Sequence, residues 1–231
     1  MPNWCTNTLT VKGDSQATQD FLRRIKTTNE DGAIEYRILP NLFPTPEELQ
    51  ITSTTAWEEI PENWSKWVNE GTWSQAEYDE RVAKNFDLLA KQKSNMEKYG
   101  HKDWYSWCVD NWGSKWGDCD TEVLSEYEGG VDIRFDSAWS PPVDGIAHIS
   151  KMFPSLLFVL TFEEMGMDYY GSVVIRNGAW QDSEGKMSEL ASYEAVGDWE
   201  DTEKVEAFYD ELSDAKEKCE NEALAKMGEK W

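Results

Sequence analysis

The segment DNWGSKWGDCD is the densest group of residues suited to chemistry. It contains three aspartates and two glycines, namely Asp110, Gly113, Gly117, Asp118 and Asp120. Carboxylates are ligands that a hard cation such as Ca²⁺ prefers, but the Glu and Gly offsets of an EF-hand are absent. Glycine also suits a compact turn because it has no Cβ. We therefore predict a turn between a helix and a strand at this point, and no metal or other cofactor.

The four cysteines are scattered along the chain as Cys5, Cys108, Cys119 and Cys219. No C-x-x-C pair is present, and a tetrahedral zinc site normally shows such close pairs. His101 and His148 are the only histidines, and nothing in the spacing pairs either with a thiol nucleophile. The pattern favours reduced thiols in a cytoplasmic protein and argues against an enzyme.

The charge balance restricts the partners. Lys and Arg number 22 against 45 Asp and Glu, a formal net charge of −23. Phosphate binding needs a basic surface, so direct binding to nucleic acid is not expected, and neither is adhesion to anionic membranes. No secretory signal or membrane span is expected either. The acidic charge is compatible with a protein partner whose surface is basic.

Hydrophobic periodicity predicts the elements of the first half. Residues 6–11 alternate polar and apolar side chains, as a half-buried strand does, and Asp14 is placed to cap a helix that follows to about Thr27. Ser74 and Glu77 form a capping box, which predicts a long helix to about Tyr99. We interpret residues 41–102 as a Trp-rich, largely helical insertion, with Trp57, Trp64 and Trp67 in a loop-rich stretch.

The second half has clearer turn signals. Residues 122–127 and 131–135 are strand-like around Gly129-Gly130, and Ser140 is expected to cap a helix that begins at Pro141-Pro142. A nearly continuous apolar run over 155–162 predicts a central strand. Asn177-Gly178 predicts a further hairpin. The order β-α-β-β-α-β predicts an α+β fold of the ferredoxin-like kind, with an antiparallel sheet, helices on one face and an extra hairpin.

The last fifty residues differ in composition. Residues 182–231 contain 16 acidic and 6 basic residues, a net charge of −10. Apolar residues at helical spacing predict one long amphipathic helix from Thr202. We therefore divide the chain into a ferredoxin-like domain at 1–181, which contains the insertion, and an acidic C-terminal helical extension at 182–231.

Four stretches occur together in a fixed order: MPNWCTNTLTVKGD, WYSWCVDNWGSKWGDCD, FDSAWSPP and FEEMGMDYYGSVVIRNG. In this combination the chain resembles the YubB-like ferredoxin-like family, which phages and conjugative plasmids carry. The resemblance covers about Met1 to Trp180, apart from Pro44 to Lys102. It implies a ferredoxin-like fold and a mobile-element origin, but no iron–sulfur cluster and no particular mechanism. The acidic tail departs from the family pattern.

A ferredoxin-like sheet can bind single-stranded RNA through exposed aromatic side chains. Trp4, Tyr127 and Phe135 are the residues that would form such a platform here. The basic residues that should accompany them are missing from the sequence pattern, so we expect these aromatics to have structural roles.

Two interpretations of the acidic helix stay open. One is a solvated surface that keeps the protein soluble. The other is mimicry of nucleic-acid phosphates, which would attract and block a host protein with a basic nucleic-acid-binding surface, such as a defence factor. The residues predicted to bind this partner are Glu203, Glu206, Asp210, Glu211 and Asp214, with Trp57, Trp64 and Trp67 as apolar anchors.

Two further functions are not excluded. The alternative hypothesis is a protein or enzyme that binds a small, nucleotide-like ligand in a Trp-lined groove between the insertion and the sheet. A structural or assembly role is a third possibility, and it predicts oligomers of this chain with no host partner.

Overall fold

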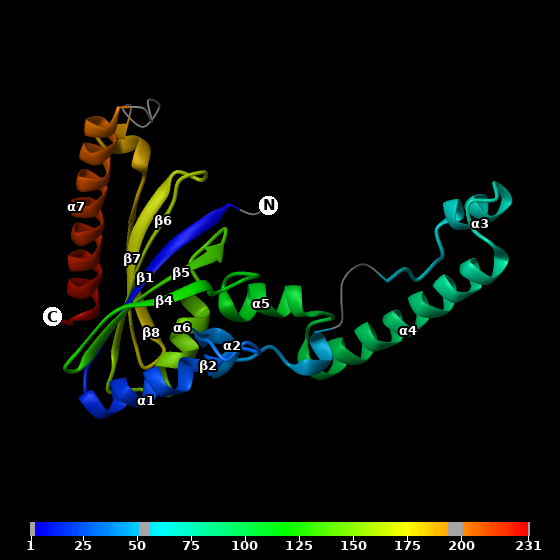
Figure 1. The fold of residues 1–231 in the computed structure, drawn as a ribbon, viewed down its shortest axis with the longest axis horizontal. Coiled ribbons are helices and arrows are strands. Elements are labelled where there is room, and N and C mark those ends of the chain that lie inside the picture. The colour runs from blue at the N-terminus through cyan, green and yellow to red at the C-terminus, as the bar shows by residue number, and fades with distance from the viewer. Residues whose placement is uncertain (1–2, 51–55, 194–200, 231) are drawn as a thin grey trace. The chain divides into compact units, whose positions relative to one another are not determined.

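A computed structural model describes residues 3–50, 56–193 and 201–230 of the chain (Figure 1). The chain forms two compact units. The first, here called the sheet unit, comprises Met1–Pro44 and Cys108–Trp231, and the second, the helical unit, comprises Thr45–Trp107. The predicted insertion falls largely within the helical unit. The predicted C-terminal extension is part of the sheet unit.

The sheet unit contains eight described strands. They are β1 (Trp4–Lys12), β2 (Lys26–Thr28), β3 (Ile34–Tyr36), β4 (Cys119–Tyr127), β5 (Gly130–Ala138), β6 (Leu157–Glu164), β7 (Tyr169–Arg176) and β8 (Ala179–Gly185). Its helices are α1 (Ser15–Ile25), α2 (Leu39–Leu42), α6 (Val143–Ser150), η2 (Met187–Glu189) and α7 (Thr202–Met227). The helical unit has η1 (Glu47–Leu49), α3 (Glu62–Asn69) and α4 (Gln75–Tyr99), and α5 (Trp104–Trp112) runs across the boundary between the units.

Six strands form one antiparallel sheet in the order β4-β5-β1-β6-β7-β8. The first four positions are the strand order of a ferredoxin-like fold, because α1 and α6 are the two crossover helices between them. β7 and β8 extend the sheet beyond β6. The hairpin that joins them has φ values of 49° at Asn177 and 82° at Gly178, as a type I′ turn requires. The predicted fold and extra hairpin are confirmed.

The two faces of the sheet bury different partners. One face packs against α1 and α6, where Phe21 meets Phe158 edge-to-face with ring centroids 5.6 Å apart. Burial in β1 alternates, and Cys5, Asn7, Leu9 and Val11 have 0% exposure on this face. The alternation arises because successive side chains of a strand point to opposite faces, and it sets the register of the whole sheet.

α7 covers the other face, over β6, β7 and β8 (Figure 1). Its apolar side chains form two clusters with the sheet: Phe208, Leu212 and Cys219 pack near Tyr170, and Ala223 and Leu224 pack on Leu157, Val159 and Val174. Asp201 caps the helix by accepting from the Lys204 N–H at 3.3 Å, and Gly228 ends it with φ of 75°. The helix is therefore anchored along its length by hydrophobic burial.

Three local predictions need correction. Ser140 does not cap α6, because its hydroxyl donates to the Gly113 carbonyl at 2.7 Å and Pro142 precedes the helix. Trp64 and Trp67 lie in helix α3, which begins directly after Pro61, and not in a loop. The short hairpin β2–β3 was not predicted at all, since three-residue strands carry little periodicity.

The helical unit is organised around α4. The predicted capping box is confirmed: the Ser74 N–H donates to the Glu77 carboxylate at 2.7 Å, and the Ser74 hydroxyl accepts from the Glu77 N–H. The buried positions of α4 are polar, namely Asn85, Gln92 and Asn95. Asn85 bonds both backbone groups of Trp57 at 2.8 Å. Side-chain-to-backbone hydrogen bonds from buried amides therefore contribute to holding this unit together.

Candidate functional site

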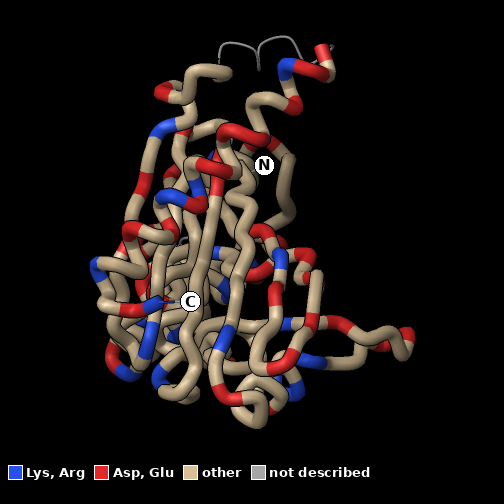
Figure 2. The backbone as a smooth tube through the Cα atoms, turned by 90° about the vertical axis from the view of Figure 1, so that its left-hand side faces the viewer, with Lys and Arg blue, Asp and Glu red and all other residues tan. Residues whose placement is uncertain are grey.

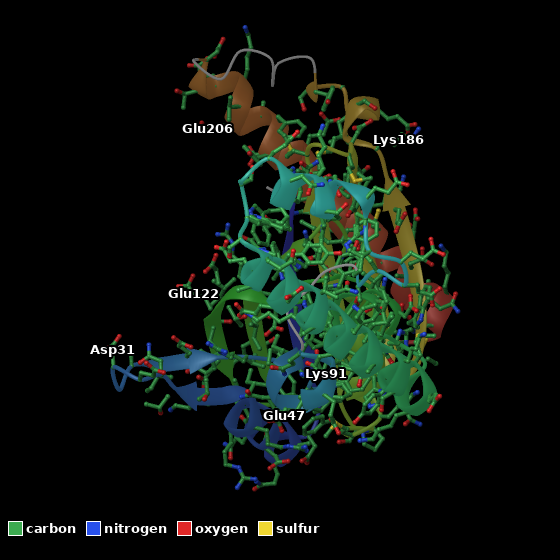
Figure 3. The ribbon with its side chains drawn as sticks, turned by 90° about the vertical axis from the view of Figure 1, so that its right-hand side faces the viewer. Asp31, Glu47, Lys91, Glu122, Lys186 and Glu206 are labelled. Carbon is green, nitrogen blue, oxygen red and sulfur yellow. The ribbon has the colours of Figure 1, made fainter. Side chains whose placement is uncertain are left out.

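α7 presents a row of carboxylates on the side turned away from the sheet. Its members lie three or four residues apart and are all exposed: Glu203, Glu206, Asp210, Asp214 and Glu217, here called the acidic stripe. With a rise of 1.5 Å per residue, the stripe is about 21 Å long, one carboxylate per about 5 Å. Phosphates of one DNA strand follow one another at about 3.4 Å along the axis, a density of the same order. Figure 3 shows Glu206 near the beginning of α7.

Polar clamps hold α7 in one orientation. Lys216 pairs with Glu163 of β6 at 2.5 Å, with both side chains largely buried, and Glu222 accepts from Ser183 of β8 at 2.7 Å. Near the end of the helix, Arg176 pairs with Glu229 at 2.6 Å. These contacts and the apolar clusters fix the rotation of the helix, so the acidic stripe is presented on a rigid support.

Glu211, the fifth predicted acidic residue of α7, differs from the other four. It is half-buried, and its carboxylate accepts from the N–H groups of Ala191 and Ser192 at 2.9 and 2.8 Å and from the Ser192 hydroxyl. The hydrogen bonds from Ser192 lower the pKa of Glu211. Glu211 therefore ties the segment before α7 to the helix, and it is not part of the acidic stripe.

The predicted tryptophan anchors belong to the helical unit. Trp64 and Trp67 both pack on Trp73 edge-to-face, with ring centroids 5.8 and 4.7 Å apart, and Arg81 lies 4.4 Å from the Trp73 ring centroid. Trp57 is 46% exposed, and Asn85 holds its backbone. The structure thus groups Trp64 and Trp67 around Trp73, a residue that the sequence did not single out.

The aspartate-rich turn has a structural role. The Asp118 carboxylate accepts from the Ile38 N–H at 2.6 Å and the Leu39 N–H at 3.3 Å, where α2 begins. Burial raises the pKa of Asp118 to about 7. A Cβ at Gly117 would lie 2.0 Å from the Leu39 side chain, so any larger residue there requires the buried Leu39 side chain to move. Among the described residues, no three His, Cys, Asp or Glu side chains are grouped to hold a metal ion.

Three of the four thiols, those of Cys5, Cys119 and Cys219, lack the environment of a nucleophile. Cys5 is fully buried, and burial raises its pKa to about 12, so the thiol is neutral at physiological pH. Burial also raises the pKa of Cys119 and of Cys219. Thiolate is the reactive form, and each of these environments disfavours it.

The aromatic platform for RNA, which the sequence pattern disfavours, does not form as one surface. Phe135 is 1% exposed and points to the α1/α6 face of the sheet, whereas Trp4 and Tyr127 are exposed on the opposite face. The sequence pattern also missed two lysines: Lys115 lies 4.2 Å from the Trp116 ring centroid, and Lys12 lies 5.8 Å from that of Tyr127. A three-residue aromatic platform is therefore excluded.

Three surface cavities of the sheet unit bear on the small-ligand hypothesis. Their volumes are about 400 to 460 Å³, and none has tryptophan in its lining. The first lies between α1 and the β4–β5 hairpin, the second beside α7, and the third between β3 and the beginning of β4. These cavities do not provide the Trp-lined site of that hypothesis.

None of the described helices is both long enough and apolar enough to cross a membrane.

Acidic residues outnumber basic ones over much of the backbone seen from the α7 side in Figure 2. The surface chemistry around α7 is therefore suited to a cationic partner.

The sheet order and its two crossover helices define an α+β domain of the ferredoxin-like class. Residues 111–210 match the family model described as "Ferredoxin-like domain in Api92-like protein", so over this range the chain is similar to such a domain. The crystal structure of a protein api92 from Yersinia pseudotuberculosis is also similar, with 13% identity and a TM-score of 0.41 over 80% of this chain and 98% of that one. None of the curated proteins matches the chain.

Proposed function

We propose that the protein is a cytoplasmic accessory protein of a phage or plasmid, as its resemblance to the YubB-like family implies. It binds a host protein that handles nucleic acid, such as a defence factor, and inhibits it by acting as an acidic mimic of the phosphate backbone. The acidic stripe on α7 carries this proposal. Its carboxylates are exposed, regularly spaced and mounted on a helix whose opposite side is buried in the sheet.

Rigid presentation separates this surface from an ordinary solvated one. A carboxylate on a mobile chain loses conformational entropy when it pairs with a partner, whereas a fixed array is already organised for binding. The formal charge of −23 adds a long-range attraction that speeds association with a basic surface and weakens as salt is added. The proposed complex therefore forms fast and is sensitive to salt.

The test is capture from a bacterial lysate fraction enriched on heparin, a polyanion that retains nucleic-acid-binding proteins. The stripe variant replaces Glu203, Glu206, Asp210 and Asp214 with Lys, and Glu211 stays unchanged because it anchors Ser192. We expect the wild-type protein to retain basic proteins at low salt and release them at high salt. The stripe variant should retain none of them.

A matched control variant separates position from total charge. It reverses four exposed acidic residues of the helical unit, Glu59, Glu62, Asp79 and Glu97, and so has the same net charge as the stripe variant. We expect it to retain the same proteins as the wild type. Equal loss in both variants, or no loss in the stripe variant when circular dichroism shows that it is folded, would contradict a role for the stripe.

A further inference from the structure

Half of one sheet face has no helix packed on it within the described part of the sheet unit. α7 covers β6, β7 and β8 on this face, while no helix packs extensively on β1, β5 or β4 there. We call this uncovered half the open face. Its residues come from alternate positions of neighbouring strands, including Trp4, Thr6, Thr10, Tyr127, Asp132 and Asp136.

Two carboxylates on the open face are fixed by their neighbours. Asp132 accepts from the Thr10 hydroxyl at 2.8 Å and from the Ser125 hydroxyl at 2.7 Å, and Asp136 accepts from the Thr6 hydroxyl at 3.1 Å. Each carboxylate keeps acceptor capacity for a further donor, since an ionised carboxylate has about four lone-pair sites. Both are half-buried, and Arg134 stands exposed between them. The open face thus has two oriented anionic positions.

An aromatic pair closes one end of the open face. Trp4 and Trp116 stack with ring centroids 6.0 Å apart and an interplanar angle of 25°, and they are 41% and 40% exposed. Lys115 already lies 4.2 Å from the Trp116 centroid. This internal contact places a cation near the negative face of the Trp116 indole ring, an arrangement that is favourable. The Trp4 ring offers the corresponding place to a cation from outside.

The side of α7 that borders the open face adds to this chemistry. Lys216 reaches Glu163 of β6, so the side of the helix that carries Lys216 is turned toward β1. Tyr209 and Glu220 share that side at helical spacing, and Tyr209 is 44% exposed. Glu122 of β4 lies at the opposite margin and is labelled in Figure 3. Acidic and aromatic groups therefore flank the open face on both sides.

We propose that the open face binds an extended, arginine-containing segment of the protein partner. The inference rests on the proposed function and adds a second contact surface to it. Guanidinium suits this face better than ammonium because its planar fork matches a carboxylate and its flat face stacks on indole. Asp132 and Asp136 are four residues apart on one strand, about 13 Å, which an extended segment spans with arginines at positions i and i+4. Arg134 disfavours a basic residue midway between them.

The experiment uses fluorescence anisotropy with labelled peptides and the full-length protein at low salt. The probe is a decapeptide of Thr and Ser with two arginines four positions apart. Two comparison peptides are used. The first has the same composition but adjacent arginines, and the second has lysines in place of both arginines. We expect the spaced arginine peptide to bind most tightly. Trp4→Ala is expected to weaken its binding about five- to tenfold, the size of a cation–π contact that is partly shielded from water.

Matched variants keep the proposal testable. The double substitution Asp132→Asn and Asp136→Asn should weaken binding by a similar factor, because each amide keeps one acceptor oxygen for a neighbouring hydroxyl but loses the charge. Trp180→Ala serves as control, since Trp180 is 43% exposed on β8 and pairs with Ile175 on the other face of the sheet. The control should bind the peptide as the wild type does.

The outcomes separate this inference from the proposed function. No binding of the spaced peptide, equal binding of the adjacent-arginine peptide, or equal loss in the Trp4 and Trp180 variants would overturn the open-face site. If the stripe variant still loses lysate capture in that case, the proposed function stands without this site. If Trp4→Ala weakens binding of the spaced peptide and the stripe variant still captures basic proteins from lysate, the open face binds arginine segments and the mimicry proposal fails.

Discussion

The sheet unit and the helical unit are stabilised in different ways. In the sheet unit, apolar side chains from three strands of the ferredoxin-like core and from α7 are buried to 2% exposure or less, including Phe158, Leu160 and Phe208. In the helical unit, the apolar residues that are buried among the described ones are Leu49 and Trp107, and the buried residues of α4 are amides. Hydrophobic burial dominates protein stability, so a rigid binding surface is expected on the sheet unit.

A core truncation in each unit should give the largest contrast. Phe208→Ala removes a fully buried ring from beneath the acidic stripe, and we expect it to lower the free energy of unfolding of the sheet unit by about 3–5 kcal/mol. Phe86→Ala in α4 removes a ring that is 47% exposed, so its cost should be below about 1 kcal/mol. Urea unfolding followed by circular dichroism measures both. Similar losses in the free energy of unfolding for the two variants would contradict the proposed difference in how the units are stabilised.

The second prediction concerns pH and Asp118, whose carboxylate accepts from the first N–H groups of α2. Burial raises its folded-state pKa to about 7, above the ordinary aspartate value of 3.8. The folded protein therefore holds this proton over a range in which the unfolded chain has lost it, and stability falls as pH rises from about 4 to 7. The expected loss is on the order of 3 kcal/mol.

Asp118→Asn should remove most of this pH dependence, because the amide does not titrate. Urea midpoints at the two ends of the pH range give the comparison, and Asp79→Asn in the helical unit serves as a surface control. A wild-type protein whose stability rises between these pH values, while the Asp118 variant behaves in the same way, would show that Asp118 does not set the slope.

The helical unit should respond most to its helix cap, which is the smallest of the three effects. Ser74→Ala removes one half of the capping box of α4, at an expected cost of about 1 kcal/mol. Hydrogen exchange of the first turns of α4 should speed up, and exchange in α7 should stay unchanged because Asp201 caps that helix separately. Unchanged exchange in α4 would mean that tertiary contacts, and not the cap, hold its first turn.

The elements that the sequence predicted well are those with strong local signals. The alternation in β1, the Asn177-Gly178 turn and the Ser74 capping box each specify structure within a few residues. The helix cap predicted at Ser140 is wrong because its hydroxyl donates to the carbonyl of Gly113, 27 residues earlier. A local pattern has no information on such a distant competitor.

The candidate binding surface likewise has features that local sequence spacing predicts and features that depend on distant residues. Helical spacing placed the carboxylates of α7 on one side of the helix. It did not separate Glu211 from the others, because Glu211 differs through its hydrogen bond from the Ser192 N–H, which lies outside the helix. The Trp4–Trp116 pair was out of reach because sheet pairing brings together residues that are far apart in the chain. Single-sequence periodicity can assign a residue to a face, but it cannot identify the partner on that face.

If the sheet unit acts as a nucleic-acid mimic, its surface occupies the nucleic-acid site of a basic protein. Displacement of the captured proteins by duplex DNA tests it most directly. The protein is immobilised, loaded with the heparin-enriched fraction at low salt and washed with duplex DNA or with neutral dextran. We expect DNA to release the retained proteins and dextran to leave them bound. Retention of every captured protein in the presence of excess DNA would contradict it, because partner and DNA would then bind at separate sites.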